Sequence, residues 1–133
     1  MTSTILLVED DEPLRSTLAR HLRGHGYAVV QADSAEGAID QIRRGWHPAL
    51  VILDINLPGE TGWSLLRDPA ITALGPVPVV VASATAINPR RLREYGVAGY
   101  LPKPFPLETL VSTVERLINQ EQGTREARGT QEP

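Results

Sequence analysis

The chain contains no cysteine, and only one of its thirteen basic residues is a lysine. The absence of cysteine excludes a disulfide framework, a thiolate metal site and a thiol nucleophile. A net charge of −3, with the arginines scattered along the chain, gives no electrostatic footprint for nucleic acid. No apolar run is long enough to span a membrane and no basic segment precedes the first apolar run, so we expect neither a membrane span nor a signal peptide.

The length of 133 residues suits a single domain with an ordinary core. Apolar runs alternate with segments of helical spacing along the chain. The helical segments carry boundary signals, with Pro13 at a helix start and Ser34 and Asn88 as N-caps. Gly62 opens a short helix that Pro69 disrupts. This alternation predicts an α/β fold in which helices cover both faces of a parallel sheet.

The end of the chain differs in composition from the rest. The last helix is predicted from about Leu107 to Gln120, where apolar residues recur on one face. Residues 121–133 include a single alanine as their only apolar residue. We therefore interpret residues 3–120 as the domain and residues 121–133 as a disordered tail or the start of a linker.

Four apolar segments lead to polar side chains that can take part in chemistry. These are Glu9 and Asp10 after residues 5–8, Asp54 after residues 49–53, Ser83 after residues 77–82, and Lys103 after residues 99–101. Near-continuous apolar runs are typical of strands buried on both faces, and ligands of parallel α/β sheets collect at the carboxyl ends of such strands. The sequence therefore predicts several acids, a hydroxyl and one ammonium around a single crevice.

The acids of this group predict a metal site. An isolated acid after a strand is usually a turn former or a helix cap, and we interpret Asp11 as such a cap. Asp54 differs because Glu9 and Asp10 end a neighbouring strand, and clustered carboxylates repel one another unless a cation lies among them. Since the cluster holds no cysteine or histidine, a hard ion such as Mg²⁺ fits it. A carboxylate beside such an ion can form an aspartyl phosphate.

Ser83 and Lys103 match what a phosphoryl group at this crevice requires, which is fixed donors and a cation. Alone, a strand-end serine is most often a cap and a lysine is most often a solvated charge. The chain uses arginine at every other basic position, so the single lysine indicates a requirement for a compact ammonium. Thr85 offers a second hydroxyl, but the register of the preceding strand favours Ser83.

Four motifs together resemble the receiver domains of two-component response regulators, the CheY-like family. They are residues 8–11 (VEDD), 53–59 (LDINLPG), 80–84 (VVASA) and 100–105 (YLPKPF), and the resemblance covers roughly residues 3–120. It implies a doubly wound, flavodoxin-like sheet of five parallel strands in the order 2-1-3-4-5. It also implies a cytoplasmic signalling module that takes phosphate from a sensor histidine kinase or a histidine phosphotransfer protein. Such a module acts on an effector and catalyses only its own phosphorylation and dephosphorylation.

The resemblance implies a metal-binding role for each acid of the cluster. Asp54 is expected to accept the phosphoryl group. Mg²⁺, or Mn²⁺ in its place, is expected to bind Asp10, Asp54 and the backbone carbonyl of Asn56. Glu9 is expected to act on the ion through a water molecule.

The resemblance also implies a switch. Ser83 is expected to reach the phosphoryl group, Lys103 to pair with it, and the bond from Lys103 to Pro104 to be cis. Tyr100 matches the aromatic residue that turns inward when the hydroxyl moves. The stretch from Ser83 to Lys103 is shorter than in many receivers, so the helix from Asn88 is expected to be stunted. The output surface is expected to comprise that helix, the strand at residues 99–101 and the last helix.

Two other functions remain open. A phosphohydrolase of the haloacid dehalogenase type also uses an aspartate and Mg²⁺, but it needs a second aspartate where this chain has Asn56, and a cap domain. A receiver-like docking module that works without phosphorylation usually lacks an acid or the lysine, and this chain retains both. His21, His25 and His47 lie outside the cluster, and we interpret them as surface or loop residues.

Overall fold

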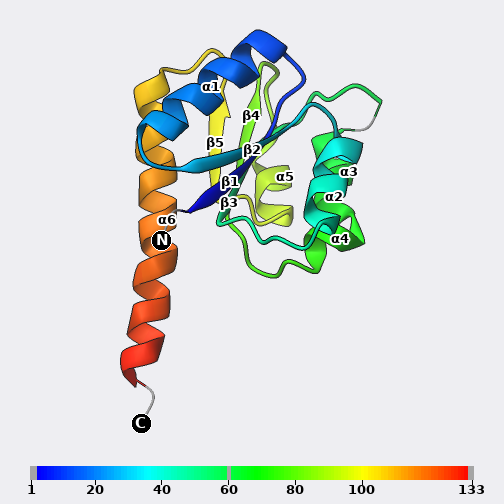
Figure 1. Cartoon of the computed structure of the whole chain (residues 1–133). Coiled ribbons are helices and arrows are strands. Elements are labelled where there is room, and N and C mark those ends of the chain that lie inside the picture. Colours follow the sequence, from blue (N-terminus) through cyan, green and yellow to red (C-terminus); the bar gives the residue numbers. More distant parts are fainter. Residues whose placement is uncertain (1–2, 60, 132–133) are drawn as a thin grey trace.

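Five parallel strands form one sheet in the order β2-β1-β3-β4-β5 (Figure 1). The computed structural model describes residues 3–59 and 61–131, with side chains as far as Gln120. The strands are β1 (Thr4–Val8), β2 (Ala28–Ala32), β3 (Leu50–Asp54), β4 (Val79–Ser83) and β5 (Gly99–Pro102). The predicted fold class and strand order are therefore confirmed.

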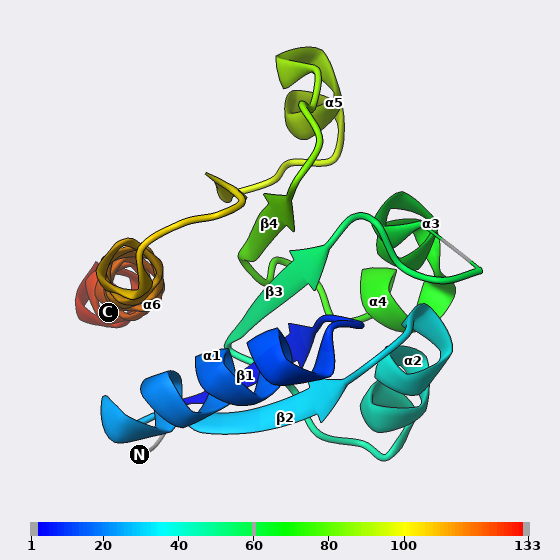
Figure 2. The ribbon, with the colours of Figure 1, turned by 90° about the horizontal axis from the view of Figure 1, so that it is seen from above.

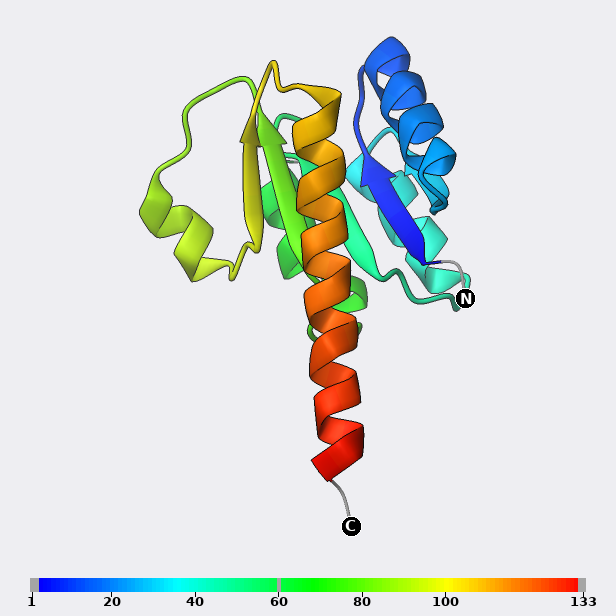
Figure 3. The same ribbon diagram turned by 90° about the vertical axis from the view of Figure 1, so that its left-hand side faces the viewer.

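Helices cover both faces of this sheet. They are α1 (Glu12–Gly24), α2 (Ala35–Arg43), α3 (Gly62–Arg67), α4 (Pro69–Thr72), α5 (Pro89–Glu94) and α6 (Leu107–Gln131). Figure 3 looks onto the face that α1 and α6 cover, and Figure 2 shows α2, α3 and α4 on the opposite face. None of the helices within the described residues combines the length and the apolar character needed to cross a membrane.

The alternation of side chains along each strand divides the core into two layers. In β1, Ile5 and Leu7 belong to the core beneath α1 and α6, whereas Leu6 and Val8 belong to the core on the other face. All four side chains are fully buried. Successive residues of a strand point to opposite faces, so a strand covered on both sides must be apolar throughout. This is why the strands appear in the sequence as unbroken apolar runs.

The helix starts follow the local signals in the sequence. The side chain of Asp11 accepts the backbone N–H of Leu14 at 3.1 Å, which confirms its role as the cap of α1. Ser34 and Asn88 cap α2 and α5 in the same manner. These caps satisfy backbone N–H groups that have no partner within the helix.

Helix α6 continues beyond its predicted end at Gln120 and reaches Gln131. The apolar face that packs on the sheet ends at Ile118, but Glu, Gln, Arg and Ala after it favour helix and allow the backbone to continue. The side chains of residues 121–131 and the whole of residues 132–133 lie outside the described residues. The division of the chain at residue 120 stays a prediction.

Helix α5 is short, as the sequence predicts, and has no buried residue. It lies apart from the other helices in Figure 2. Tyr95, which caps its end, packs against Trp63 of α3 with ring centroids 4.8 Å apart and an angle of 34° between the ring planes. The guanidinium of Arg91 lies 5.6 Å from the Trp63 ring centroid, and that of Arg67 lies 5.6 Å from the Tyr95 ring centroid. Partly buried Leu92 also packs on the core, so aromatic and cation–π contacts add to a small aliphatic contact in holding α5.

Gly62 marks the point at which α3 packs directly on the end of β3. A Cβ at this position would lie 2.8 Å from the carbonyl oxygen of Asp54 and 2.9 Å from Cδ1 of Ile55. Gly62→Ala should therefore lower the free energy of unfolding by about 1–3 kcal/mol through overpacking. Gly24→Ala in α1 is the matched control, since nothing lies within 4 Å of its Cβ position, and it should cost nothing. Urea unfolding of both variants measures the difference, and equal losses would contradict this prediction.

Candidate functional site

The carboxyl ends of the strands bring the predicted polar residues to one edge of the sheet. Glu9 follows β1, Asp54 ends β3 and Ser83 ends β4, and their exposed fractions are only 2%, 4% and 1%. Lys103 follows β5, and its side chain is 17% exposed. Buried polar groups require partners, so the arrangement depends on what these side chains bind.

Lys103 joins the two buried carboxylates. Its Nζ donates to Oε1 of Glu9 at 2.5 Å and to Oδ2 of Asp54 at 3.1 Å. The other oxygens of these carboxylates accept backbone N–H groups, that of Asp11 for Glu9 at 3.2 Å and that of Asn56 for Asp54 at 3.0 Å. Each carboxylate is thus held by one ammonium and one amide.

The pKa values of Glu9 and Lys103 reflect burial and their mutual contact. The pKa of Glu9 is raised from 4.5 to about 7, chiefly by burial and in part by nearby Asp54, against the lowering effect of the bond from Lys103. Burial alone would lower the pKa of Lys103, but its bonds with Glu9 and Asp54 outweigh burial and raise it. The ammonium is therefore firmly protonated while the acids remain short of positive charge.

The acids are arranged as a cation site requires. Glu9, Asp10 and Asp54 each offer a carboxylate oxygen, and these oxygens all lie within 4.8 Å of one another. Within the described residues, no other group of three acidic, histidine or cysteine side chains meets this criterion. Asp10 is exposed, so the cluster is open to solvent on that side. Oxygen donors of this kind fit Mg²⁺ or Mn²⁺.

The hydroxyl of Ser83 makes contacts that the sequence did not reveal. It donates to the carbonyl oxygen of Thr85 at 3.0 Å and accepts the backbone N–H of Thr85 at 3.1 Å. The side-chain amide of Asn56 donates to the hydroxyls of Ser83 at 3.3 Å and Thr85 at 3.4 Å. Thr85 and the Asn56 side chain therefore belong to the site, although the sequence indicates Thr85 only as an alternative hydroxyl and the resemblance implies only a backbone role for Asn56.

Arg15 is a further site residue that the sequence analysis missed. Its Nη1 donates to the backbone carbonyl of Glu9 at 2.8 Å and so fixes the segment between β1 and α1. The residue lies one turn after the cap of α1, and no sequence signal distinguishes it from the other arginines.

Tyr100 lies further than Ser83 from the edge of the sheet that carries the site. It pairs in register with Val81, whereas Ser83 pairs with Pro102. Val81 and Ser83 share one face of β4, and Tyr100 is partly buried on that same face, which α2 to α5 cover. The bond from Lys103 to Pro104 is cis, as the resemblance implied.

Residues 5–115 match the family model of the response regulator receiver domain. The chain belongs to this family. It is 33% identical over 123 residues to the phosphate regulon transcriptional regulatory protein PhoB of Klebsiella pneumoniae, a match that covers 89% of this chain and 52% of PhoB. The chain thus spans about half the length of this relative.

Solved structures agree with this assignment. The non-phosphorylated HemR receiver domain of Leptospira biflexa superposes with a TM-score of 0.77 at 36% identity, over 88% of this chain and 94% of that one. The receiver domain of a putative LuxO repressor protein from Vibrio parahaemolyticus superposes with a TM-score of 0.85 at 24% identity, over 96% of this chain and 98% of that one, and supports the fold alone. As a response regulator receiver, the domain is a phosphate-accepting module of two-component signalling.

The raised pKa of Glu9 predicts how stability depends on pH in metal-free buffer. The folded state keeps the Glu9 proton up to about pH 7, whereas an ordinary carboxyl loses it near 4.5. The contribution of Glu9 to the free energy of unfolding should therefore fall as the pH rises between these values, by on the order of 3 kcal/mol. Glu9→Gln should remove this part of the pH profile, whereas Glu12→Gln, at an exposed carboxyl in α1, should leave it unchanged. Urea unfolding across this pH range tests the prediction. Parallel pH profiles of the free energy of unfolding for Glu9→Gln and the unaltered chain would show that Glu9 does not titrate as stated.

Proposed function

We propose that Asp54 is the phosphoacceptor of this receiver and that it works with Mg²⁺ held by Asp10, Asp54 and the backbone carbonyl of Asn56. Glu9 acts on the ion through water. The observation that supports this most directly is the meeting of three carboxylates and the only lysine of the chain at the end of β3. Mg²⁺ supplies the positive charge that the acids lack and that a phosphoryl donor requires for its approach.

The chain's own groups orient Asp54 for the transfer. One carboxylate oxygen receives the backbone N–H of Asn56, and the other receives the ammonium of Lys103. An oxygen of Asp54 forms a bond to phosphorus while the bond from phosphorus to the donor nitrogen breaks. The imidazole of the donor histidine leaves. Lys103 can then follow the charge onto the phosphoryl oxygens.

The same contacts suggest how phosphorylation changes shape. The hydroxyl of Ser83 is bonded to Thr85 in the structure, so it must exchange these bonds to reach a phosphoryl group on Asp54. That movement frees space on the face of the sheet that Tyr100 shares. We infer that Ser83 and Tyr100 form the switch, and that α5, β5 and α6 carry the output surface.

The partners follow from this role. The phosphoryl donor is a sensor histidine kinase or a histidine phosphotransfer protein in the cytoplasm, and an effector reads the switched surface. We propose no contact of this domain with nucleic acid or membrane, since its charge favours neither. The phosphohydrolase alternative is less well supported, because Asn56 stands where a second aspartate is required and its side-chain amide is bonded to Ser83.

The proposal predicts modification of Asp54 that depends on metal. Acetyl phosphate with Mg²⁺ should add one phosphoryl group to the chain, whereas EDTA should suppress the addition because the acids then repel the donor. Asp54→Asn should abolish the modification, and Asp40→Asn, at an exposed aspartate on α2, should leave it intact. Intact-mass spectrometry measures all four cases. Equal labelling in EDTA, or labelling of Asp54→Asn, would refute the assignment.

The switch is predicted to need an ammonium and not merely a positive charge. Beryllofluoride with Mg²⁺ should change backbone hydrogen exchange in α5 and β5, because α5 is weakly held and Tyr100 lies on β5. Lys103→Arg should reduce this change while the domain stays folded, since a planar guanidinium cannot occupy the space between Glu9 and Asp54. Exchange changes confined to residues 27–44, or an unaltered response in Lys103→Arg, would contradict the proposed switch.

A further inference from the structure

The backbone carbonyl of Glu9 lies just beyond the end of β1, where the pairing of strands stops. The N–H of Glu9 still donates to the carbonyl oxygen of Ala32 at 3.0 Å. Among the described residues, however, no backbone N–H donates to the carbonyl oxygen of Glu9. Nη1 of Arg15 donates to it instead, at 2.8 Å, from the start of α1. A side chain thus completes the backbone bonding at the residue that begins the acid segment.

Asp10 depends on this bond because it has none of its own. None of the hydrogen bonds among the described residues involves the side chain or the backbone of Asp10, and the residue is exposed. The direction of its side chain is therefore set by the planar peptide groups that precede and follow it. Arg15 fixes the first of these planes through the carbonyl of Glu9. A carboxylate oxygen of Glu9 fixes the second by accepting the N–H of Asp11 at 3.2 Å.

The two bonds differ in how a metal ion would affect them. In the proposed function the carboxylate of Glu9 acts on Mg²⁺ through water, so its bond to the N–H of Asp11 competes with the ion. Arg15 binds only the backbone, and its guanidinium forms no ion pair with an acid among the described residues. Its own backbone N–H donates to the carbonyl oxygen of Asp11 at 2.8 Å, so Arg15 spans the acid segment from end to end. It can therefore hold the segment with or without the ion.

We propose that Arg15 is a positioning residue for the metal, and that it sets the affinity for Mg²⁺ by holding Asp10 in place. The inference rests on the proposed function, because it requires Mg²⁺ at the carboxylate cluster. The oxygens of this cluster lie within 4.8 Å of one another, and a turn of the peptide group before Asp10 would carry its carboxylate away from the other two. Groups that orient metal ligands without touching the metal typically change its affinity by about 10–100-fold.

The direction of the effect separates positioning from charge. A guanidinium beside the acid segment repels Mg²⁺, so the loss of its charge alone would strengthen Mg²⁺ binding. The loss of positioning weakens Mg²⁺ binding instead. Arg15→Ala removes both the charge and the bond to Glu9, and it should lower the affinity for Mg²⁺ roughly tenfold. A fall in affinity for a cation when a positive charge is removed is the opposite of what charge predicts.

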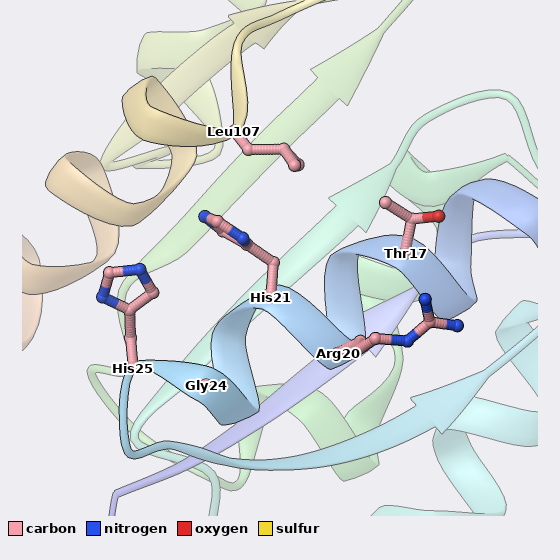
Figure 4. A pocket seen from close by; sticks show the side chains of 6 residues that line it. All are labelled: Thr17, Arg20, His21, Gly24, His25 and Leu107. Atoms are coloured by element: carbon pink, nitrogen blue, oxygen red, sulfur yellow. The ribbon is translucent and has the colours of Figure 1, made fainter.

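Two other arginines of α1 are matched controls. Nη2 of Arg23 donates to the carbonyl oxygen of Val29 at 2.9 Å, a bond of the same kind that also joins residues six apart, but at the opposite end of the helix. Arg20 makes no side-chain hydrogen bond among the described residues, and Figure 4 shows its side chain extending away from His21 and His25. Arg23→Ala removes a charge and a carbonyl bond, whereas Arg20→Ala removes a charge alone. Neither change should lower the affinity for Mg²⁺.

Titration with Mg²⁺, followed by the backbone amide NMR signals of Asp11 and Asn56, measures the affinity in each variant. The dispersion of the same spectra shows whether the variant is folded. Arg15→Lys keeps a donor at the end of a long side chain, and it should recover part of the affinity that Arg15→Ala loses.

Other outcomes would overturn the role of Arg15. Equal or tighter Mg²⁺ binding in Arg15→Ala, or an equal fall in Arg23→Ala, would refute it and leave the proposed function intact. No recovery in Arg15→Lys would show that the bond to Glu9 is not the cause of the loss. Absence of Mg²⁺ binding by the unaltered chain would refute the proposed function itself, and this inference with it.

Discussion

The ammonium of Lys103 between Glu9 and Asp54 is the interaction on which the functional edge of this domain depends. Two carboxylates from neighbouring strands are almost fully buried there, and taking such charges out of water is costly unless a cation compensates them. Lys103 comes from the far side of β4, so the interaction ties together the ends of β1, β3 and β5. The strand order brings Lys103, which lies late in the sequence, into contact with Glu9 and Asp54, which lie much earlier.

One cation for three acids leaves the site poised for further positive charge. Burial is the main cause of the raised pKa of Glu9 and neighbouring Asp54 adds to it, so the single ammonium of Lys103 does not restore the ordinary pKa of this carboxyl. In the proposed mechanism a divalent ion would relieve this shortage of positive charge, and Lys103 would become available to a phosphoryl group on Asp54. We therefore propose that the resting and phosphorylated states compete for the Lys103 side chain, a role for which a compact, mobile cation is better suited than a guanidinium.

Local signals explain how much the sequence could predict. Strand ends, the caps at Asp11, Ser34 and Asn88, and the short helix α5 all follow from neighbours in sequence, and the structure confirms them. The strand order came only from the family resemblance, because alternation alone does not order a sheet. The bonds that hold the Ser83 hydroxyl depend on rotamers and loop geometry, so no pattern in the sequence reveals them. Helix α6 continues past Gln120 because a polar composition does not by itself end a helix, and the Glu, Gln, Arg and Ala residues that follow favour it.

The two helices next to β5 differ in how they can transmit a signal. Helix α5 has no fully buried residue and is held by partly buried Leu92 and by the aromatic and guanidinium contacts around Trp63 and Tyr95, so a shift of α5 disturbs less of the core. Helix α6 buries Leu110 and Val114 completely, and any large movement there would open the packing beneath α1. A change at Tyr100 is therefore expected to alter the position of α5 first and to leave α6 as a rigid arm.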